Sequence, residues 1–285
     1  MHNSLWDNGG KMNKKILIVI VVLTVIFSVS TFFIIKYHYQ SNATEQLYQE
    51  VYESMTEPET NQTLATENAD VDKNTNPYAN IPENSGITTS DTSTSTNVLS
   101  AEKNEDMVGW IKIDGTKINY PVMFTPNEPD FYLNHDFYKN ENIYGCPYVQ
   151  ANCNVVAPSD NVIIYGHHMN DGTMFAELEK FKSKDFWKSH KKISFDTLNK
   201  KGTYEIMAVF AVSVDDANDN SFKFYEFVNS YDPQHFRDFV NKCKNLSFYN
   251  TGVNAEYGDK LLTLSTCDYT YNNGRLVVVA KRISS

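Results

Sequence analysis

The chain has 285 residues, with 25 Lys and Arg against 35 Asp and Glu, and its formal net charge is −10. This acidity argues against a nucleic-acid partner, because affinity for phosphate groups is built from clustered Lys and Arg. Aromatic residues make up 13% of the chain, which excludes full disorder, and four cysteines are too few for a disulfide scaffold of this length. The acidity is concentrated in residues 41–100, where ten acidic residues accompany one lysine.

The first predicted element is a membrane-spanning helix. Ile16 to Ile35 is a run of twenty uncharged, mostly apolar residues, long enough to cross a hydrocarbon core of roughly 30 Å. A cleaved signal peptide is the alternative, but its apolar stretch is about 7–15 residues and ends in small residues, whereas Lys36 follows here. We therefore favour an uncleaved anchor over 16–35. The lysines that precede it predict a cytoplasmic segment 1–15, with the rest of the chain outside.

An extracytoplasmic stalk is predicted over residues 36–97. It begins with a short amphipathic helix pattern over Ala43–Met55, in which Leu47 and Val51 share a face, and we expect this helix to be marginal and without chemistry. From residue 57 onward the composition is Thr, Ser, Asn, Asp and Glu with few large apolar residues. Such a stretch buries too little apolar surface to offset its ordering entropy, so we expect a flexible acidic stalk.

Residues 98–285 have a globular composition and are predicted to form one mainly β domain. Two apolar runs joined through Asp114-Gly115 predict a hairpin. The predicted strands are Val108–Ile113, Lys117–Met123, Ile143–Gln150, Asn161–Tyr165, Lys192–Phe195, Thr203–Val214, Lys260–Thr266 and Leu276–Ile283. Helical spacing of apolar residues predicts helices over Met174–His190 and Pro233–Leu246. About eight short strands with a few peripheral helices predict a closed or nearly closed β-barrel.

Three residues at strand ends could form a cysteine-nucleophile site. The strand Lys260–Thr266 leads into Cys267, where a nucleophile is held rigidly yet remains accessible. Arg275 opens the next strand, so it faces Cys267 if the two strands are neighbours, and its guanidinium could stabilise a thiolate or an oxyanion. His167 follows the strand Asn161–Tyr165 and could serve as an acid or base.

These residues carry a resemblance to a known family. The stretch Leu264-Ser-Thr-Cys267, the run Arg275-Leu-Val-Val-Val-Ala-Lys281, and Ile163-Ile-Tyr-Gly-His167-His-Met-Asn-Asp-Gly-Thr-Met-Phe175 resemble the sortases, and among them class B. Supporting stretches are Val108–Ile113, Ile118–Val122 and Tyr132–Asp136. The resemblance covers roughly residues 98–283 and implies a sortase-like barrel. A membrane anchor agrees with it, since sortases work outside the cell while tethered to the membrane.

The resemblance also implies the roles of the site residues. Cys267 is then the nucleophile, His167 the acid and base, and Arg275 the residue that stabilises the oxyanion or positions the substrate. His168 is adjacent and stays an alternative, but the family pattern takes the histidine directly after glycine. Arg275 comes eight positions after Cys267, a slightly shorter spacing than the class B pattern has.

Three further residues are weaker candidates for substrate binding. Class B sortases carry an acidic residue near the active site, and Asp268 either fills that place or is a solvated loop carboxylate. Ser265 and Thr266, just before Cys267, either line the substrate groove or are ordinary strand residues.

The implied reaction is transpeptidation. A surface protein with a C-terminal sorting motif of the Asn-Pro-x-Thr type would be cut after Thr to give a thioester on Cys267, and an amine of the peptidoglycan precursor would release it as an amide. We expect substrate recognition to involve Asn199–Gly202 and the region Asp215–Leu246. No cysteine pair or His/Cys/Asp cluster has metal-ligand spacing, so neither a metal nor a cofactor is expected.

Other functions remain open at this point. An L,D-transpeptidase also uses an extracytoplasmic cysteine, but it has Gly directly before the cysteine and Arg two residues after it, where this chain has Thr266 and Tyr269. A papain-like protease places its cysteine before its histidine in the chain. A stalked adhesin or a catalytically inactive binding module is the alternative from another class, and the reactivity of Cys267 separates it from an enzyme.

Overall fold

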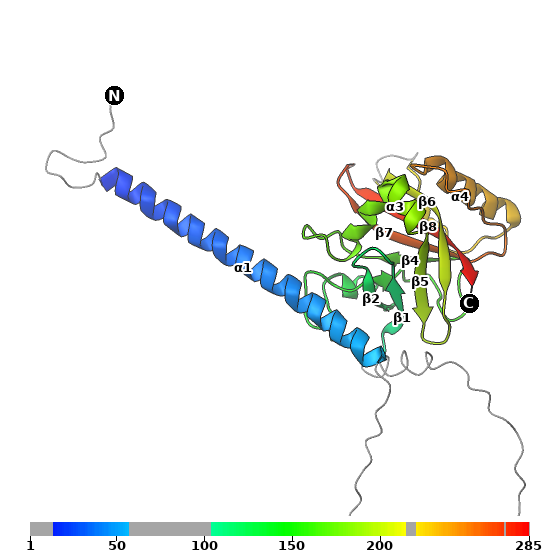
Figure 1. Cartoon of the computed structure of the whole chain (residues 1–285), viewed down its shortest axis with the longest axis horizontal. Helices are drawn as coiled ribbons and strands as arrows, with labels where there is room; N and C mark the ends of the chain where they lie inside the picture. Colours follow the sequence, from blue (N-terminus) through cyan, green and yellow to red (C-terminus); the bar gives the residue numbers. More distant parts are fainter. Residues whose placement is uncertain (1–13, 57–103, 215–220, 271, 285) are drawn as a thin grey trace, which may run out of the picture.

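A computed structural model describes residues 14–56, 104–214, 221–270 and 272–284. It contains one long helix, α1, and a barrel domain against which the C-terminal part of that helix lies (Figure 1). The predicted cytoplasmic residues 1–13 and the part of the predicted stalk from residue 57 to 97 lie outside the described residues.

Helix α1 runs without interruption over Lys14–Thr56. Its N-terminal part is long and apolar enough to cross a membrane, and the side chains of the predicted span are largely exposed. The amphipathic helix predicted over 43–55 is part of α1. Residues 36–56 of the predicted stalk belong to α1, and the helix expected there to be marginal buries Thr44, Tyr48 and Val51 against the barrel domain.

The barrel confirms the predicted fold class. Its strands are β1 (Met107–Lys112), β2 (Asn119–Met123), β3 (Tyr148–Val149), β4 (Asn161–Tyr165), β5 (Lys192–Thr197), β6 (Thr203–Ser213), β7 (Leu261–Asp268) and β8 (Gly274–Ser284). They close in the order β1-β2-β3-β4-β7-β8-β6-β5. The predicted hairpin is β1–β2, and Gly115 supplies the positive φ of 77° that its turn requires.

The pairing of β4 with β7 positions the site. These strands are parallel, with Asn161 beside Leu261 and Tyr165 beside Ser265, and β7 is antiparallel to β8 along its whole length. The carboxyl ends of β4 and β7 and the start of β8 therefore meet at one edge of the barrel. All three candidate catalytic residues were predicted at the strand ends that meet at this edge.

One of the two predicted helices of the barrel domain is divided into shorter elements, and the other has its predicted bounds. The predicted helix over Met174–His190 is a 3-10 helix η2 (Phe175–Lys182) followed by the short helix α3 (Lys184–Ser189). Extended backbone at Ser183 separates them, and its side chain caps α3 by accepting from the Phe186 N–H. Helix α4 (Pro233–Leu246) begins after the Asp232 cap, as its pattern predicts. Two further 3-10 turns are η1 (Phe131–Leu133) and η3 (Phe224–Glu226).

The predicted strand over Ile143–Gln150 is reduced to the two residues of β3. Gly145 has a φ of 56°, which is left-handed rather than extended backbone, and its N–H donates to the Asn142 carbonyl in a turn. A Cβ at Gly145 would lie 2.3 Å from the Tyr132 carbonyl oxygen. The chain must therefore turn at this glycine to pass close to η1, and the strand starts only after it.

Candidate active site

Cys267 and Arg275 face each other across β7 and β8, as predicted. They are directly paired in the antiparallel register, so their side chains lie on the same face of the sheet. Cys267 is partly exposed, whereas the other three cysteines, Cys146, Cys153 and Cys243, are buried and all four are free thiols. Burial raises the pKa of Cys153 to about 11 and raises those of Cys146 and Cys243 as well. Among the four thiols, only Cys267 is open to a substrate.

His167 follows β4 at the edge of the barrel that carries Cys267. The β4–β7 ladder pairs Tyr165 with Ser265, and the Gly166 N–H extends it by donating to the Ser265 carbonyl at 3.2 Å. His167 comes two residues after Tyr165, and Cys267 comes two residues after Ser265. Both residues therefore lie near the carboxyl ends of neighbouring parallel strands.

The two neighbouring histidines have different hydrogen-bond partners. The His167 Nε2–H donates to the Leu133 carbonyl of η1 at 2.7 Å, which leaves Nδ1 as the basic nitrogen of that ring. The His168 Nδ1–H donates to the backbone carbonyl of Cys267 at 2.8 Å, and its ring lies 5.0 Å from that of Tyr269. His167 is thus held by a segment outside the sheet, whereas His168 contacts the main chain of the nucleophile candidate.

Two tyrosines extend the site along the Cys267 face. The rings of Tyr148 and Tyr165 lie 5.7 Å apart on β3 and β4. Burial raises the pKa of Tyr148 to about 12; the Asp130 carboxylate and Cys267 also raise it, while Arg275 lowers it. The Tyr148 hydroxyl is therefore electrostatically coupled to both catalytic candidates on β7 and β8. Neither tyrosine was predicted as a site residue, although the alternation of β4 puts Tyr165 on this face.

Asp268 lies on the opposite side of β7 from Cys267. Its side chain has no exposed surface and forms an ion pair with Lys182 of η2 at 2.7 Å, and Lys182 also pairs with Glu179 at 2.8 Å. Burial raises the pKa of Asp268, but the hydrogen bonds from Lys182 and Thr270 outweigh it and lower the pKa overall. Asp268 is therefore not a solvated loop carboxylate, because its position in β7 turns it toward Lys182 of η2.

Ser265 and Thr266 are both buried in β7, with 1% and 3% of their surface exposed. Their hydroxyl oxygens have no hydrogen-bond partner among the described residues. Strand alternation puts Ser265 on the face of Cys267 and Thr266 on the face of Asp268. Of the two, only Ser265 therefore shares a face of β7 with the candidate nucleophile.

The residues Asn199–Gly202, predicted to help recognise the substrate, are at the other end of the barrel. Asn199 lines a cavity of about 440 Å³ together with Val108, Phe195 and Tyr204. Val162 also lines it, near the start of β4, whereas the candidate catalytic residues follow the end of that strand. The structure therefore does not bring Asn199 together with Cys267.

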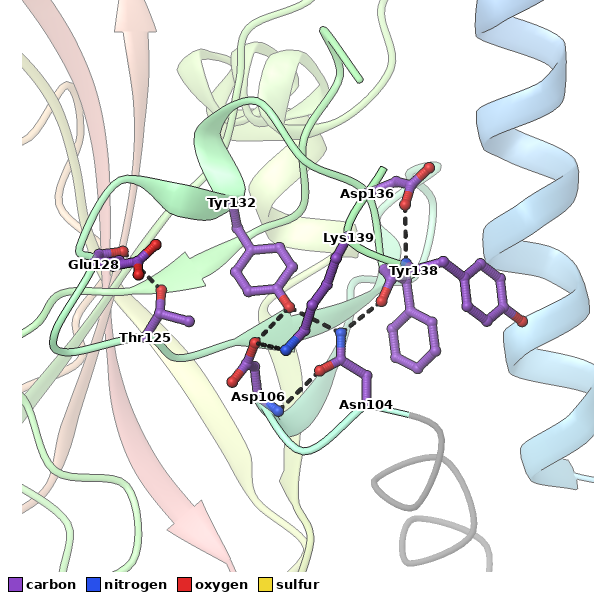
Figure 2. A network of polar contacts seen from close by, with 9 residues as sticks. Asn104, Asp106, Thr125, Glu128, Tyr132, Asp136, Tyr138 and Lys139 are labelled. Carbon is purple, nitrogen blue, oxygen red and sulfur yellow. Dashed lines mark hydrogen bonds and ion pairs between the residues drawn. The ribbon is translucent and has the colours of Figure 1, made fainter. Parts of the chain in front are cut away.

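A polar network holds η1, the segment whose Leu133 carbonyl binds His167 (Figure 2). The Tyr132 hydroxyl donates to Asp106 and accepts from the Asn104 amide, each at 2.8 Å. Lys139 pairs with Asp106 at 2.9 Å, and burial is the main reason why the pKa of Tyr132 is raised. This network could not be predicted from local sequence patterns, because Asn104 and Asp106 meet Tyr132 only in the folded chain.

The comparisons with known proteins identify the family of the barrel domain. The family model of the sortase domain matches residues 111–283. A sortase B of Staphylococcus aureus is 40% identical over 182 residues, which cover 63% of this chain and 71% of that protein. A sortase B of Listeria monocytogenes is 37% identical over 188 residues, covering 64% and 71%.

Solved structures of sortase B have the same fold. A Staphylococcus aureus sortase B–substrate complex superposes with a TM-score of 0.61 at 31% identity, covering 67% of this chain and 86% of that one. The Clostridium perfringens sortase B superposes with a TM-score of 0.59 at 31% identity, covering 66% and 99%.

The closed barrel, with a partly exposed cysteine facing an arginine at one edge, defines a cysteine transpeptidase. The chain belongs to the sortase family, and its relatives are sortases of class B.

Proposed function

We propose that Cys267 is the nucleophile, His167 the acid and base, and Arg275 the residue that stabilises the oxyanion, in a class B transpeptidase that joins surface proteins to the cell wall. The observation that carries this proposal is the direct pairing of Cys267 with Arg275 at the edge where β4 leads into His167. Sortases of class B are also the relatives that match over most of the barrel.

The substrate is a surface protein with a C-terminal sorting motif of the Asn-Pro-x-Thr type. The Cys267 thiolate attacks the Thr carbonyl carbon, and Arg275 stabilises the negative charge that develops on the carbonyl oxygen. The C–N bond then breaks, and His167 gives its proton to the departing amine, leaving a thioester. An amine of the peptidoglycan precursor attacks this thioester and loses a proton to His167, and Cys267 leaves as thiolate.

The apolar part of α1 anchors the enzyme in the cell membrane, with its N-terminus inside and the barrel domain outside. Lys14 and Lys15 begin the helix, and the positive-inside rule places them in the cytoplasm. The acceptor is a cell-wall precursor and the substrates are exported proteins, so both meet the barrel domain on the outer side.

The test uses the full chain in detergent micelles and a set of quenched peptides that vary each position of the motif. We expect thiol-dependent cleavage that is best for Asn-Pro-x-Thr peptides, and amide formation when an oligoglycine or diaminopimelate-type amine is added. A methanethiosulfonate reagent should label Cys267 and stop the reaction. If the parent chain neither cleaves any peptide nor labels at Cys267, the proposed function is overturned.

A further inference from the structure

The C-terminal half of α1 is built into the barrel domain along one face, here called the docked face: Tyr37, Ser41, Thr44, Tyr48, Val51 and Tyr52. From Tyr37 to Val51 these residues recur every three or four positions, and Tyr52 comes four after Tyr48, which is the spacing of one helix face. Thr44, Tyr48 and Val51 keep at most 3% of their surface exposed. The Tyr48 ring packs at 5.5 Å from that of Tyr120, and Tyr52 lies at the same distance from Trp110.

One contact of the docked face leads to the loop that carries His167. The Ser41 hydroxyl donates to Asp171 Oδ2 at 2.7 Å, and the Tyr144 hydroxyl donates to the same oxygen at 2.8 Å. The other oxygen, Oδ1, accepts from the Thr173 N–H at 3.0 Å and its hydroxyl at 2.6 Å. Asp171 comes four residues after His167, so α1 holds the tip of this loop.

The loop itself is closed, so a constraint at its tip is transmitted to its base. The Phe175 N–H donates to the His167 carbonyl at 2.9 Å, and His168 forms a β-bridge with Met174. Burial raises the pKa of Asp171, but the hydrogen bonds from Thr173, Ser41 and Tyr144 outweigh it and lower the pKa. The carboxylate therefore stays ionised and remains a strong acceptor for the Ser41 hydroxyl.

A second contact of the docked face leads to the side chain of His167. The Tyr48 hydroxyl donates to the Gly145 carbonyl and lies 3.1 Å from the sulfur of Cys146. Gly145 approaches η1 so closely that a Cβ there would lie 2.6 Å from the Leu133 carbonyl oxygen. That oxygen is the partner of His167 Nε2. Tyr48 thus supports the backbone against which the His167 ring is held.

We propose that the docked face of α1 is a positioning element for His167, with Ser41 and Tyr48 as its positioning residues. The two contacts reach His167 from its loop and from its ring, whereas Cys267 and Arg275 are fixed by the β7–β8 ladder. Releasing α1 would loosen the histidine relative to a cysteine that stays in place. This inference rests on the proposed function, in which His167 carries the proton.

The experiment uses the full chain in detergent micelles and the hydroxyl of Ser41. Valine and threonine have the same shape, so Ser41→Val removes the hydroxyl and Ser41→Thr keeps it. We expect Ser41→Val to lower kcat for peptide cleavage about tenfold with KM within about twofold, because misplacing a catalytic group by a fraction of an ångström costs this much. Ser41→Thr should restore kcat to within about twofold of the parent.

The matched control is Ser28→Val, in the exposed apolar part of the same helix. The Ser28 hydroxyl donates only within α1, to the Thr24 carbonyl at 2.8 Å. This substitution should leave kcat and KM unchanged. Tyr48→Phe tests the second contact and should lower kcat by a similar factor, and the double variant Ser41→Val/Tyr48→Phe should lower it about a hundredfold.

Alkylation of Cys267 by iodoacetamide is measured for every variant, together with thermal unfolding. Equal alkylation and a lowered kcat would place the defect at the proton-transfer step. The inference is overturned if Ser41→Val and Tyr48→Phe keep the parent kcat, or if Ser41→Thr loses as much activity as Ser41→Val. The proposed function fails separately, if the parent chain does not cleave the peptide or if His167→Ala cleaves as fast as the parent.

Discussion

The two faces of β7 at the site edge carry side chains of opposite character. On one face, Cys267 is partly exposed and lies opposite Arg275. On the other, Asp268 is fully buried and paired with Lys182. Strand alternation therefore separates a reactive residue from a structural one at adjacent positions. Proximity in sequence to a nucleophile says little about function, and the face on which a side chain lies says much more.

The largest effect is expected at the nucleophile. Cys267→Ala should abolish transpeptidation, with a loss of about 10⁴-fold or more, because no thioester can form. Cys153→Ala is the matched control, since it removes a buried thiol away from the pair with Arg275 and should keep kcat. The measurement is cleavage of a quenched sorting peptide. If Cys267→Ala keeps activity within tenfold of the parent, Cys267 is not the nucleophile, and its face of β7 is not the catalytic one.

The next effect separates the adjacent histidines. His167→Ala should lower kcat by about 10²–10⁴-fold, the usual contribution of general acid–base catalysis. His168→Ala removes a hydrogen bond to the Cys267 carbonyl and should cost less than about tenfold. Steady-state cleavage of a quenched sorting peptide measures both losses. The reverse order of the two losses would transfer the acid and base role to His168.

Arg275 should respond to a change of shape as well as of charge. Arg275→Met should lower kcat/KM by about 10²–10³-fold, because a donor to the developing oxyanion is lost. Arg275→Lys keeps the charge but not the planar fork of donors, and should recover only part of this loss. Steady-state kinetics of both variants, with Arg237→Lys on the exposed part of α4 as control, checks the prediction. Full activity in Arg275→Met would exclude an electrostatic role.

The smallest effect on catalysis, and a clear one on stability, is expected at Asp268. Asp268→Asn should keep kcat within about threefold, while lowering the free energy of unfolding by about 1–3 kcal/mol, because the buried partner of Lys182 loses its charge. In the parent, the folded-state pKa of Asp268 is lowered, so its contribution is present above about pH 4 and is lost as the pH falls further.

Urea unfolding at pH 7 and at pH 3 measures this contribution, and the difference between parent and variant should shrink at the lower pH. Asp185→Asn, at an exposed ion pair with Lys188, serves as control and should change stability little. A large loss of kcat in Asp268→Asn, with stability unchanged, would show that the second face also takes part in catalysis.

The barrel was largely predictable because its strands are marked by local composition. The apolar run Asn161–Tyr165 is β4 without change of bounds, and the hairpin turn at Gly115 was marked by Asp-Gly. The strand over Ile143–Gln150 was overestimated, because the left-handed turn at Gly145 is set by its contact with η1. A local pattern cannot report such a constraint, which depends on residues that are distant in the sequence.

The candidate site was predictable in part for the same reason. The facing of Cys267 and Arg275 followed from two adjacent strands, and it is confirmed. The burial of Asp268 depends on Lys182, and the support of His167 depends on Leu133, neither of which is near in the chain. The docked face of α1 was predictable only in part. The spacing of Leu47 and Val51 predicted a helix, but no pattern in the sequence predicted the loops against which this helix packs.

The unbroken course of α1 has a geometric consequence for the membrane anchoring proposed above. Ser41 follows Lys36 by five residues on the same helix, so the contact of Ser41 with Asp171 lies about 8 Å beyond Lys36 along the helix axis. Each residue of a helix also turns the chain by about 100°. The number of residues between the apolar span and the docked face therefore sets two quantities. One is the distance of the catalytic edge from the lipid, and the other is its orientation about the axis of α1. Inserting one residue after Lys36 would rotate the barrel domain about the α1 axis by about a quarter turn. Inserting seven residues would return it nearly to its original orientation.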